Sequence, residues 1–257
     1  MGARTVAAFD FDGTLIRGDS LLGFLRLACG ARATALAFAG QGPMVATSLA
    51  RGGGLERDVA KAAILARLLA GRRLADLEPL AEVHASHLAA RVRPVMRARI
   101  AAHRAAGHEV VLVSASPEIY LARMGQLLGV DAVLATRLEV DPDGRLTGRL
   151  DGPNCRGPEK AVRLRAWLHA ATPHVPGPPC APGTGGPARP GRGDRAGPVP
   201  VAAPATGGPD PVAAPATWLH AYGDSAGDVD LLAMADVPVW VGRRAWTRRR
   251  QSGGRPS

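Results

Sequence analysis

The chain has 257 residues and a mass of 26.6 kDa, with 46% hydrophobic and 21% charged residues, which excludes a fibrous or wholly disordered protein. Its formal net charge is +10, but residues 243–257 alone hold six arginines and no acidic residue, and aromatic residues make up only 4%. We expect no nucleic-acid-binding domain, because no segment that reads as folded carries a dense basic face with interleaved aromatic residues.

The cysteines and the apolar stretches indicate in which cellular compartment the protein is expected. Cys29, Cys155 and Cys180 are widely spaced and form no CxxC pair, which favours a reducing environment. No signal-peptide pattern precedes the first strand-like run, and the most apolar stretch (31–50) is interrupted by Gly and Pro, so it falls short of a membrane span. We therefore expect a cytoplasmic protein.

The first half of the chain alternates strand and helix patterns. A short buried strand is expected at 5–9, followed by a long Leu-, Ala- and Arg-rich helical segment that extends to about residue 93. Pro94 can open the next helix, which ends at Gly107. A second buried strand (109–113) and a helix closed by Gly129 (119–128) follow.

The second half continues this alternation. A hairpin at 138–150 turns at Asp141-Pro142-Asp143-Gly144, and a helix follows at 159–170. Two further strands (218–222 and 237–241) flank a helix at about 228–235. Strands that alternate with helices predict the α/β class, with a Rossmann-like parallel sheet.

Residues 172–216 do not fit this pattern. They hold 13 of the 22 prolines and 9 of the 32 glycines, and the sequence PVAAPAT occurs twice. Such a composition buries too little apolar surface to offset its ordering entropy. We interpret the segment as a disordered insertion; a proline-rich docking segment is the alternative.

Two carboxylates follow the first predicted strand. Asp10 and Asp12 lie in Phe9-Asp10-Phe11-Asp12-Gly13-Thr14, where the strand leads into a glycine-containing turn. Sites of parallel sheets lie at the carboxyl ends of the strands. One carboxylate could attack a phosphorus atom, and the other could protonate the leaving oxygen and later activate water. A DxD pair alone could also be an Asx turn.

Two further positions could serve a phosphate. Ser114 ends the second predicted strand, where its hydroxyl and nearby backbone N–H groups, such as that of Ala115, could hold a phosphate oxygen. Lys160 is one of only two lysines in the chain, and an ammonium there could offset the charge of a carboxylate beside a phosphate. A strand-terminal serine and a solvated lysine are the alternatives.

The last motif is Gly223-Asp224-Ser225-Ala226-Gly227-Asp228, directly after the strand that ends at Tyr222. Mg²⁺ takes oxygen ligands and usually binds one or two carboxylates plus substrate phosphate, so Asp224 is a candidate ligand. Asp228 could cap a helix and orient the metal shell at once.

Together these four elements resemble the haloacid dehalogenase (HAD) superfamily of phosphohydrolases, whose motifs DxDGT, Ser, Lys and GDxxxD occur in this order. The resemblance implies a catalytic core of residues 1–15, 94–171 and 217–243 with an inserted helical cap at 16–93, beside the disordered insertion and a flexible basic tail (244–257). The cap and the hairpin further resemble the phosphoserine phosphatase-like branch, subfamily IB.

The resemblance also implies a role for each motif residue. Asp10 would be the nucleophile that forms an aspartyl-phosphate, and Asp12 the general acid and base. Mg²⁺ would be held by Asp10, Asp224 and the backbone carbonyl of Asp12, with Asp228 orienting this shell. Ser114 would bind the phosphoryl group, and Lys160 would neutralise charge.

The substrate depends on the cap. Candidate substrate-binding residues are Arg17 and Asp19, with Arg26 and Glu56 as further possibilities that spacing does not assign. Phosphoserine is the leading specific substrate, within the broader class of small phosphomonoesters. The alternatives are a lipid-phosphate phosphatase that contacts an anionic membrane through the basic tail, and an inactive scaffold whose insertion recruits a partner.

Overall fold

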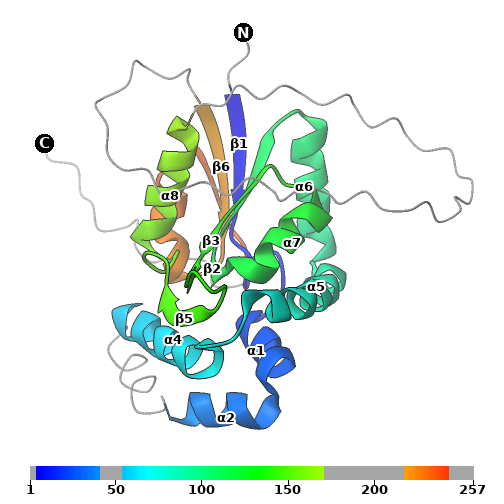
Figure 1. Cartoon of the computed structure of the whole chain (residues 1–257). Coiled ribbons are helices and arrows are strands. Elements are labelled where there is room, and N and C mark those ends of the chain that lie inside the picture. Colours follow the sequence, from blue (N-terminus) through cyan, green and yellow to red (C-terminus); the bar gives the residue numbers. More distant parts are fainter. Residues whose placement is uncertain (1–3, 41–53, 171–216, 243–257) are drawn as a thin grey trace, which may run out of the picture.

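The computed structural model describes residues 4–40, 54–170 and 217–242. Its centre is a five-stranded sheet with the order β3-β2-β1-β6-β7, in which every neighbouring pair is parallel (Figure 1). The strands are Arg4–Phe9 (β1), Glu109–Pro117 (β2), Ala132–Thr136 (β3), Thr217–Gly223 (β6) and Val237–Trp240 (β7).

The central strands are apolar on both sides because both faces of the sheet are covered. Along β1, Val6 and Ala8 join one buried cluster, whereas Ala7 and Phe9 join the other. The alternation follows from the two-residue period of a strand. This explains why the run TVAAF has no polar face.

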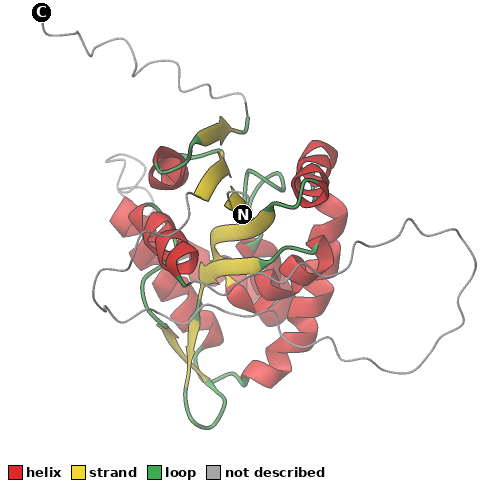
Figure 2. Ribbon diagram, turned by 90° about the horizontal axis from the view of Figure 1, so that it is seen from above, coloured by secondary structure: helices red, strands yellow, loops and turns green. Residues whose placement is uncertain are grey.

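Helices cover both faces (Figure 2). One face packs against α6 (Pro94–Ala105) and α7 (Glu118–Leu128), and the other against α8 (Pro158–His169) and α9 (Val229–Ala233), which follows the short 3₁₀ turn η1 (Ala226–Asp228). Pro94 and Pro158 occupy the first turns of their helices, where the missing N–H costs no hydrogen bond.

Four helices between the first two strands lie below the carboxyl ends of the sheet in Figure 1. They are α1 (Leu21–Cys29), α2 (Ala31–Ala39), α4 (Gly54–Leu69) and α5 (Leu74–Arg91). The hairpin of β4 (Leu138–Val140) and β5 (Leu146–Leu150) packs against α4. Gly148 permits this approach, since a Cβ there would lie 2.9 Å from the Cβ of Ala70.

The predicted α/β class and Rossmann-like parallel sheet are confirmed. Strand β3 was not predicted, although its five residues AVLAT are all buried. This short apolar run lies between Gly129 and the hairpin and carries no alternating pattern that would distinguish a strand from a connection. The insertion at 172–216, the tail at 244–257 and residues 41–50 of the apolar stretch lie outside the described residues.

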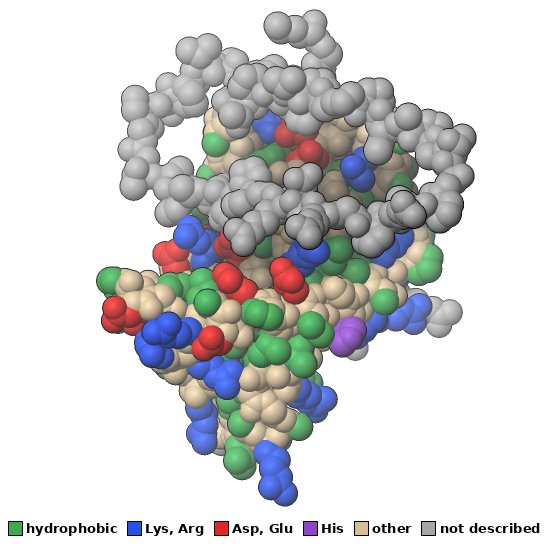
Figure 3. Space-filling view, turned by 45° about the vertical axis from the view of Figure 1, so that its right-hand side comes forward, with side chains coloured by type: hydrophobic (Ala, Val, Ile, Leu, Met, Phe, Trp, Pro, Cys, Tyr) green, Lys and Arg blue, Asp and Glu red, His purple; other side chains and the backbone are tan. Residues whose placement is uncertain are grey.

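Two surface properties complete the description. Within the part of the chain that the structure describes, no helix is long and apolar enough to cross a membrane. On the face drawn in Figure 3, the Lys and Arg side chains are spread among acidic and apolar ones rather than gathered in one patch.

Candidate active site

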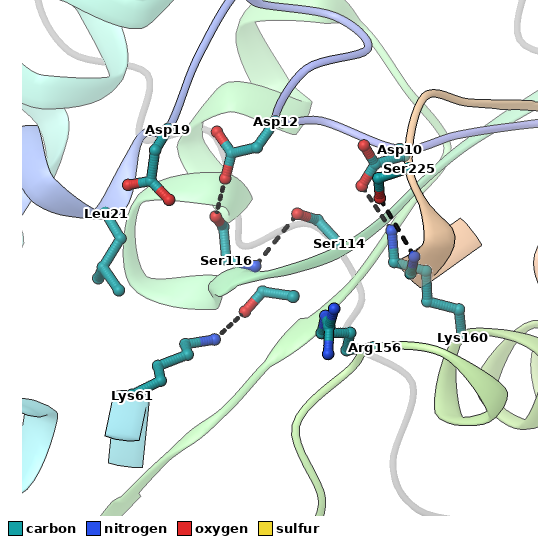
Figure 4. A pocket seen from close by; sticks show the side chains of 12 residues that line it. Asp10, Asp12, Asp19, Leu21, Lys61, Ser114, Ser116, Arg156, Lys160 and Ser225 are labelled. Atoms are coloured by element: carbon teal, nitrogen blue, oxygen red, sulfur yellow. Dashed lines mark hydrogen bonds and ion pairs between the residues drawn. The ribbon is translucent and has the colours of Figure 1, made fainter. Parts of the chain in front are cut away.

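The motif residues converge at one end of the sheet. Strand β1 has β2 on one side and β6 on the other, so this is the point where the chain's crossovers change direction and ligand sites form in open α/β sheets. Asp10 follows β1 and Asp224 follows β6, while Ser114 lies in β2, which extends beyond the predicted end. A cavity of about 180 Å³ opens here (Figure 4).

Lys160 joins two acids at the floor of the cavity. Its Nζ lies 2.5 Å from Asp10 Oδ1 and 2.5 Å from Asp228 Oδ1, and all three side chains are buried. The lysine comes from the first turn of α8, whose preceding Gly157 has φ +57°. The structure thus brings together the predicted nucleophile and the predicted neutralising cation.

Burial and charge shift the pKa values of this group. Burial raises the pKa of Asp10, and the neighbouring Asp228 carboxylate adds to the rise, while Lys160 opposes it. Burial alone would lower the pKa of Lys160, but Asp10 and Asp228 hold it above its ordinary value. Lys160 is therefore charged throughout the physiological range.

Asp12 points from the turn toward Ser20, which precedes α1, and Ser116 of β2. Its Oδ1 accepts from the Ser20 N–H at 2.8 Å, and its Oδ2 accepts from the Ser20 hydroxyl at 3.0 Å and from the Ser116 hydroxyl. Burial raises the pKa of Asp12 to about 6, although these hydrogen bonds lower it. A carboxyl group that titrates near neutral pH suits an acid that must also act as a base.

Asp224 lies against the turn that carries Asp12. Thr14 Oγ1 donates to Asp224 Oδ1 at 3.3 Å, and Gly13 approaches so closely that a Cβ there would lie 2.2 Å from Asp224 Oδ2. Burial raises the pKa of Asp224, and Asp228 adds to the rise. Gly13 also has φ +83°, so this position needs glycine for two reasons.

The acids fit a divalent cation. Carboxylate oxygens of Asp10, Asp224 and Asp228 lie within 4.8 Å of one another, and the first two have raised pKa values that a bound cation would relieve. Both oxygens of Asp228 are already used, one by Lys160 and the other by the Ser225 hydroxyl and the N–H groups of Asp224 and Ser225. Asp10 and Asp224 are thus the better ligands, and Asp228 positions the motif.

Ser114 and Ala115 also line the cavity. The Ser114 oxygen accepts from the Ser116 N–H at 3.1 Å, which leaves its own proton available to a phosphate oxygen. The Ala115 carbonyl accepts from Thr136 Oγ1 at 2.6 Å and from the ammonium of Lys61.

Lys61 is the main cavity residue that the sequence analysis missed. It comes from α4 and lines the cavity, where its Nζ also donates to Asn154 Oδ1 at 2.7 Å. Burial lowers its pKa to about 8, although Asp58 opposes this. Arg156, which also lines the cavity, adds a second cation (Figure 4). Lys61 could have been found, since the scarcity of lysine applies to it as much as to Lys160.

Of the four candidate substrate-binding residues between positions 16 and 93, one lines the cavity and three do not. Asp19 lines the cavity, where its Oδ1 also accepts from the Leu22 N–H at 3.0 Å. Arg17 is exposed and does not line the cavity, and its carbonyl accepts from Arg91. Arg26 is exposed and Glu56 half-buried, and neither lines the cavity.

The sequence matches the haloacid dehalogenase-like hydrolases over residues 7–181, more than half of the chain. The chain belongs to this family. The enzyme class that the four motifs predicted is thereby confirmed as a hydrolase of the HAD superfamily, and all of the motif residues but Asp224 and Asp228 lie inside the matched range.

Curated relatives include the protein CicA of Caulobacter vibrioides, which is 37% identical over 161 residues that cover 62% of this chain and 71% of CicA. A histidinol-phosphatase of Neisseria meningitidis is 32% identical over 95 residues, or 35% of this chain and 43% of that enzyme.

Solved structures with a similar fold include a protein of unknown function from Bordetella pertussis, with a TM-score of 0.63 and 24% identity over 90% of this chain and 87% of that chain. A phosphoserine phosphatase with a phospho-aspartyl intermediate analogue has a TM-score of 0.51 and 18% identity over 91% of this chain and 84% of that one. The HAD superfamily fold of the phosphoserine phosphatase-like structures is therefore confirmed.

Proposed function

We propose that this hydrolase is a Mg²⁺-dependent phosphomonoesterase that acts through an aspartyl-phosphate on a small phosphorylated metabolite. The observation that carries the proposal is the buried ammonium of Lys160, 2.5 Å from both Asp10 and Asp228, beside Ser114 in the same cavity. A fixed cation next to a nucleophilic carboxylate suits phosphoryl transfer, which depends mainly on positioning and charge stabilisation.

The reaction has two steps. A carboxylate oxygen of Asp10 forms a bond to phosphorus while the ester P–O bond breaks, and Asp12 gives its proton to the leaving alkoxide oxygen. Asp12, now a carboxylate, takes a proton from water, whose oxygen attacks the phosphorus and breaks the bond to Asp10. The pKa of Asp12, about 6, places both of its protonation states within reach near neutral pH.

Mg²⁺ would supply charge neutralisation for the phosphate and for the acids that face it. Asp10 and Asp224 would hold it through their side chains, together with the backbone carbonyl of Asp12. The carboxylate-only donor set supports a hard cation of this kind. Ser114 and the backbone at Ala115 would bind the transferred phosphoryl oxygens.

The cavity supports a small, charged substrate. Its volume of about 180 Å³ is below the roughly 300–1,000 Å³ of sites for drug-sized ligands. Asp19 on one side and Lys61 and Arg156 on the other offer both signs of charge to the leaving group. Phosphoserine, which carries an ammonium and a carboxylate, is our leading candidate, and the phosphoserine phosphatase-like fold supports it.

We infer that the protein works in the cytoplasm and needs no nucleic acid or membrane partner for this activity. Cys29 and Cys155 are free thiols, which supports a reducing compartment. Weak contact of an anionic membrane with the basic tail stays a proposal.

A turnover panel tests the substrate. Phosphoserine, histidinol phosphate, p-nitrophenyl phosphate and phosphatidylglycerol phosphate in mixed micelles are each assayed with Mg²⁺ and with a chelator. We expect Mg²⁺-dependent phosphate release, with kcat/KM for phosphoserine at least tenfold above that for the lipid. A preference for the lipid would overturn the proposed substrate class, and no turnover of any ester would overturn the proposed activity.

A further inference from the structure

Three histidines gather at a second position, away from the catalytic cavity. His103 lies near the end of α6, His108 precedes β2, and His220 lies in the middle of β6. One ring nitrogen of each lies within 4.8 Å of the corresponding nitrogen of the other two, and the Nδ1 atoms of His103 and His108 are 2.9 Å apart. None of the three lines the catalytic cavity.

We propose that His103, His108 and His220 form a binding site for a transition-metal ion of the Zn²⁺ class, distinct from the carboxylate site. Three imidazole nitrogens are the donor set of open zinc sites, with a Zn–N distance of about 2.0–2.1 Å. Tetrahedral geometry at that distance puts the nitrogens about 3.3 Å from one another. One pair of nitrogens in the cluster is 2.9 Å apart and every pair lies within 4.8 Å, so side-chain rotations can bring the three nitrogens to this separation.

The ring of His103 is already oriented for such a role. Its Nε2 lies 2.9 Å from the Tyr222 hydroxyl, and a proton on Nε2 that is donated to this oxygen leaves the Nδ1 lone pair directed at the cluster. Metal-binding histidines usually fix their second nitrogen in this way. Tyr222 is itself held by stacking on Phe9, with ring centroids 4.3 Å apart and an interplanar angle of 2°.

The surroundings favour the neutral imidazoles that a metal needs. Burial lowers the pKa of His103 to about 4, and His220, His108 and Arg99 add to the fall. Burial and His108 also lower the pKa of His220. One proton lies between His103 and His108 without metal, since one Nδ1 must donate to the other; a bound cation would displace it.

The partial exposure of the histidine cluster leaves room for a fourth metal ligand. His103 is buried, but His108 and His220 are half-buried, so water can complete the coordination from the solvent side, as in sites with three protein ligands. The bound ion would link α6, through His103, and the residue before β2, His108, to His220 of β6. Because the donors are nitrogens, Mg²⁺ would not compete for this site, whereas it would occupy the carboxylates.

Zinc titration of the full chain in saturating Mg²⁺, against a chromophoric chelator, tests the proposal. The variants are His108→Gln and His220→Gln, and the matched control is His87→Gln, an exposed histidine of α5. We expect the wild type and the control to bind one more zinc ion than either cluster variant, and to gain thermal stability from zinc that the cluster variants lack. Tyr222→Phe should weaken this zinc ion about tenfold.

Circular dichroism of the metal-free variants shows whether each one folds, so that a lost site is not confused with a lost fold. Co²⁺ provides a second readout: the wild type should develop the intense visible absorption of a tetrahedral site, and His220→Gln should not. Equal zinc stoichiometry in the wild type, His108→Gln and His220→Gln would overturn the proposal and leave the cluster as a hydrogen-bonded chain of neutral histidines.

Discussion

The ammonium of Lys160 lies 2.5 Å from Asp10 Oδ1, and both side chains are nearly inaccessible to solvent, with 3% and 7% of their surfaces exposed. The same ammonium binds Asp228, so one cation compensates two buried carboxylates. Such a group is costly to desolvate, and removing one partner is costlier still, because the remaining charges stay buried and unpaired.

Lys160→Met should therefore destabilise the protein as well as inactivate it. We expect the free energy of unfolding to fall by about 3 kcal/mol, measured by urea denaturation at pH 7. Glu159→Gln is the matched control on the same helix, because Glu159 pairs with Arg163 in a partly exposed ion pair that is worth less than about 1 kcal/mol. Equal losses in the two variants would contradict a stabilising role for the buried ammonium.

Gly13→Ala should disturb the acid cluster specifically. Gly13 and Gly18 have nearly the same φ, +83° and +84°, but only at Gly13 would a Cβ meet the Asp224 carboxylate, whereas at Gly18 nothing lies within 4 Å. Both alanine variants should lose about 1 kcal/mol from backbone strain. Only Gly13→Ala should also raise the Mg²⁺ concentration needed for half-maximal activity, by about tenfold or more.

A Mg²⁺ titration of activity, combined with thermal unfolding, separates these two effects. Wild-type Mg²⁺ dependence in both variants would contradict the close approach of Gly13 to the Asp224 carboxylate.

Lys61→Met should weaken substrate binding rather than chemistry. Lys61 lines the cavity and donates to the Ala115 carbonyl rather than to Asp10 or Asp12, so we expect KM to rise about tenfold with kcat little changed, as for loss of a charged hydrogen bond. Because burial lowers the pKa of Lys61 to about 8, the wild-type ammonium is present below pH 8 and is lost above it. Its KM should therefore rise above pH 8, while that of the variant stays flat.

Arg57→Met is the control for this prediction, since it removes an exposed cation from the same helix. Steady-state kinetics between pH 6 and pH 9.5 give the comparison. Identical KM profiles for the wild type and Lys61→Met would exclude contact between Lys61 and the substrate.

Much of the site could be predicted because its residues follow strands. Asp10 and Asp224 come directly after β1 and β6, and parallel strands bring their carboxyl ends to one edge of the sheet. Lys160 stands out in the sequence because lysine is so scarce in this chain. These positions depend on the order of the strands, which the alternation of strand and helix patterns already indicates.

The contacts of residues 16–93 with the rest of the chain could not be predicted. The bonds from Ser20 to Asp12 and from Lys61 to Asn154 join residues 8 and 93 positions apart in the sequence. Helical periodicity shows which face of α4 is buried but not which side chain crosses to the cavity. For the same reason Arg17 and Asp19, two residues apart, could not be distinguished, although only Asp19 lines the cavity.

The most direct test of the central claim is Mg²⁺-dependent hydrolysis of p-nitrophenyl phosphate by the wild type and by Asp10→Asn, with circular dichroism to verify that the variant folds. The amide keeps the size of the side chain but cannot attack phosphorus, so we predict that kcat falls by several orders of magnitude, at least about 10³-fold, in a folded protein. An Asp10→Asn protein with wild-type turnover would contradict the aspartyl-phosphate mechanism.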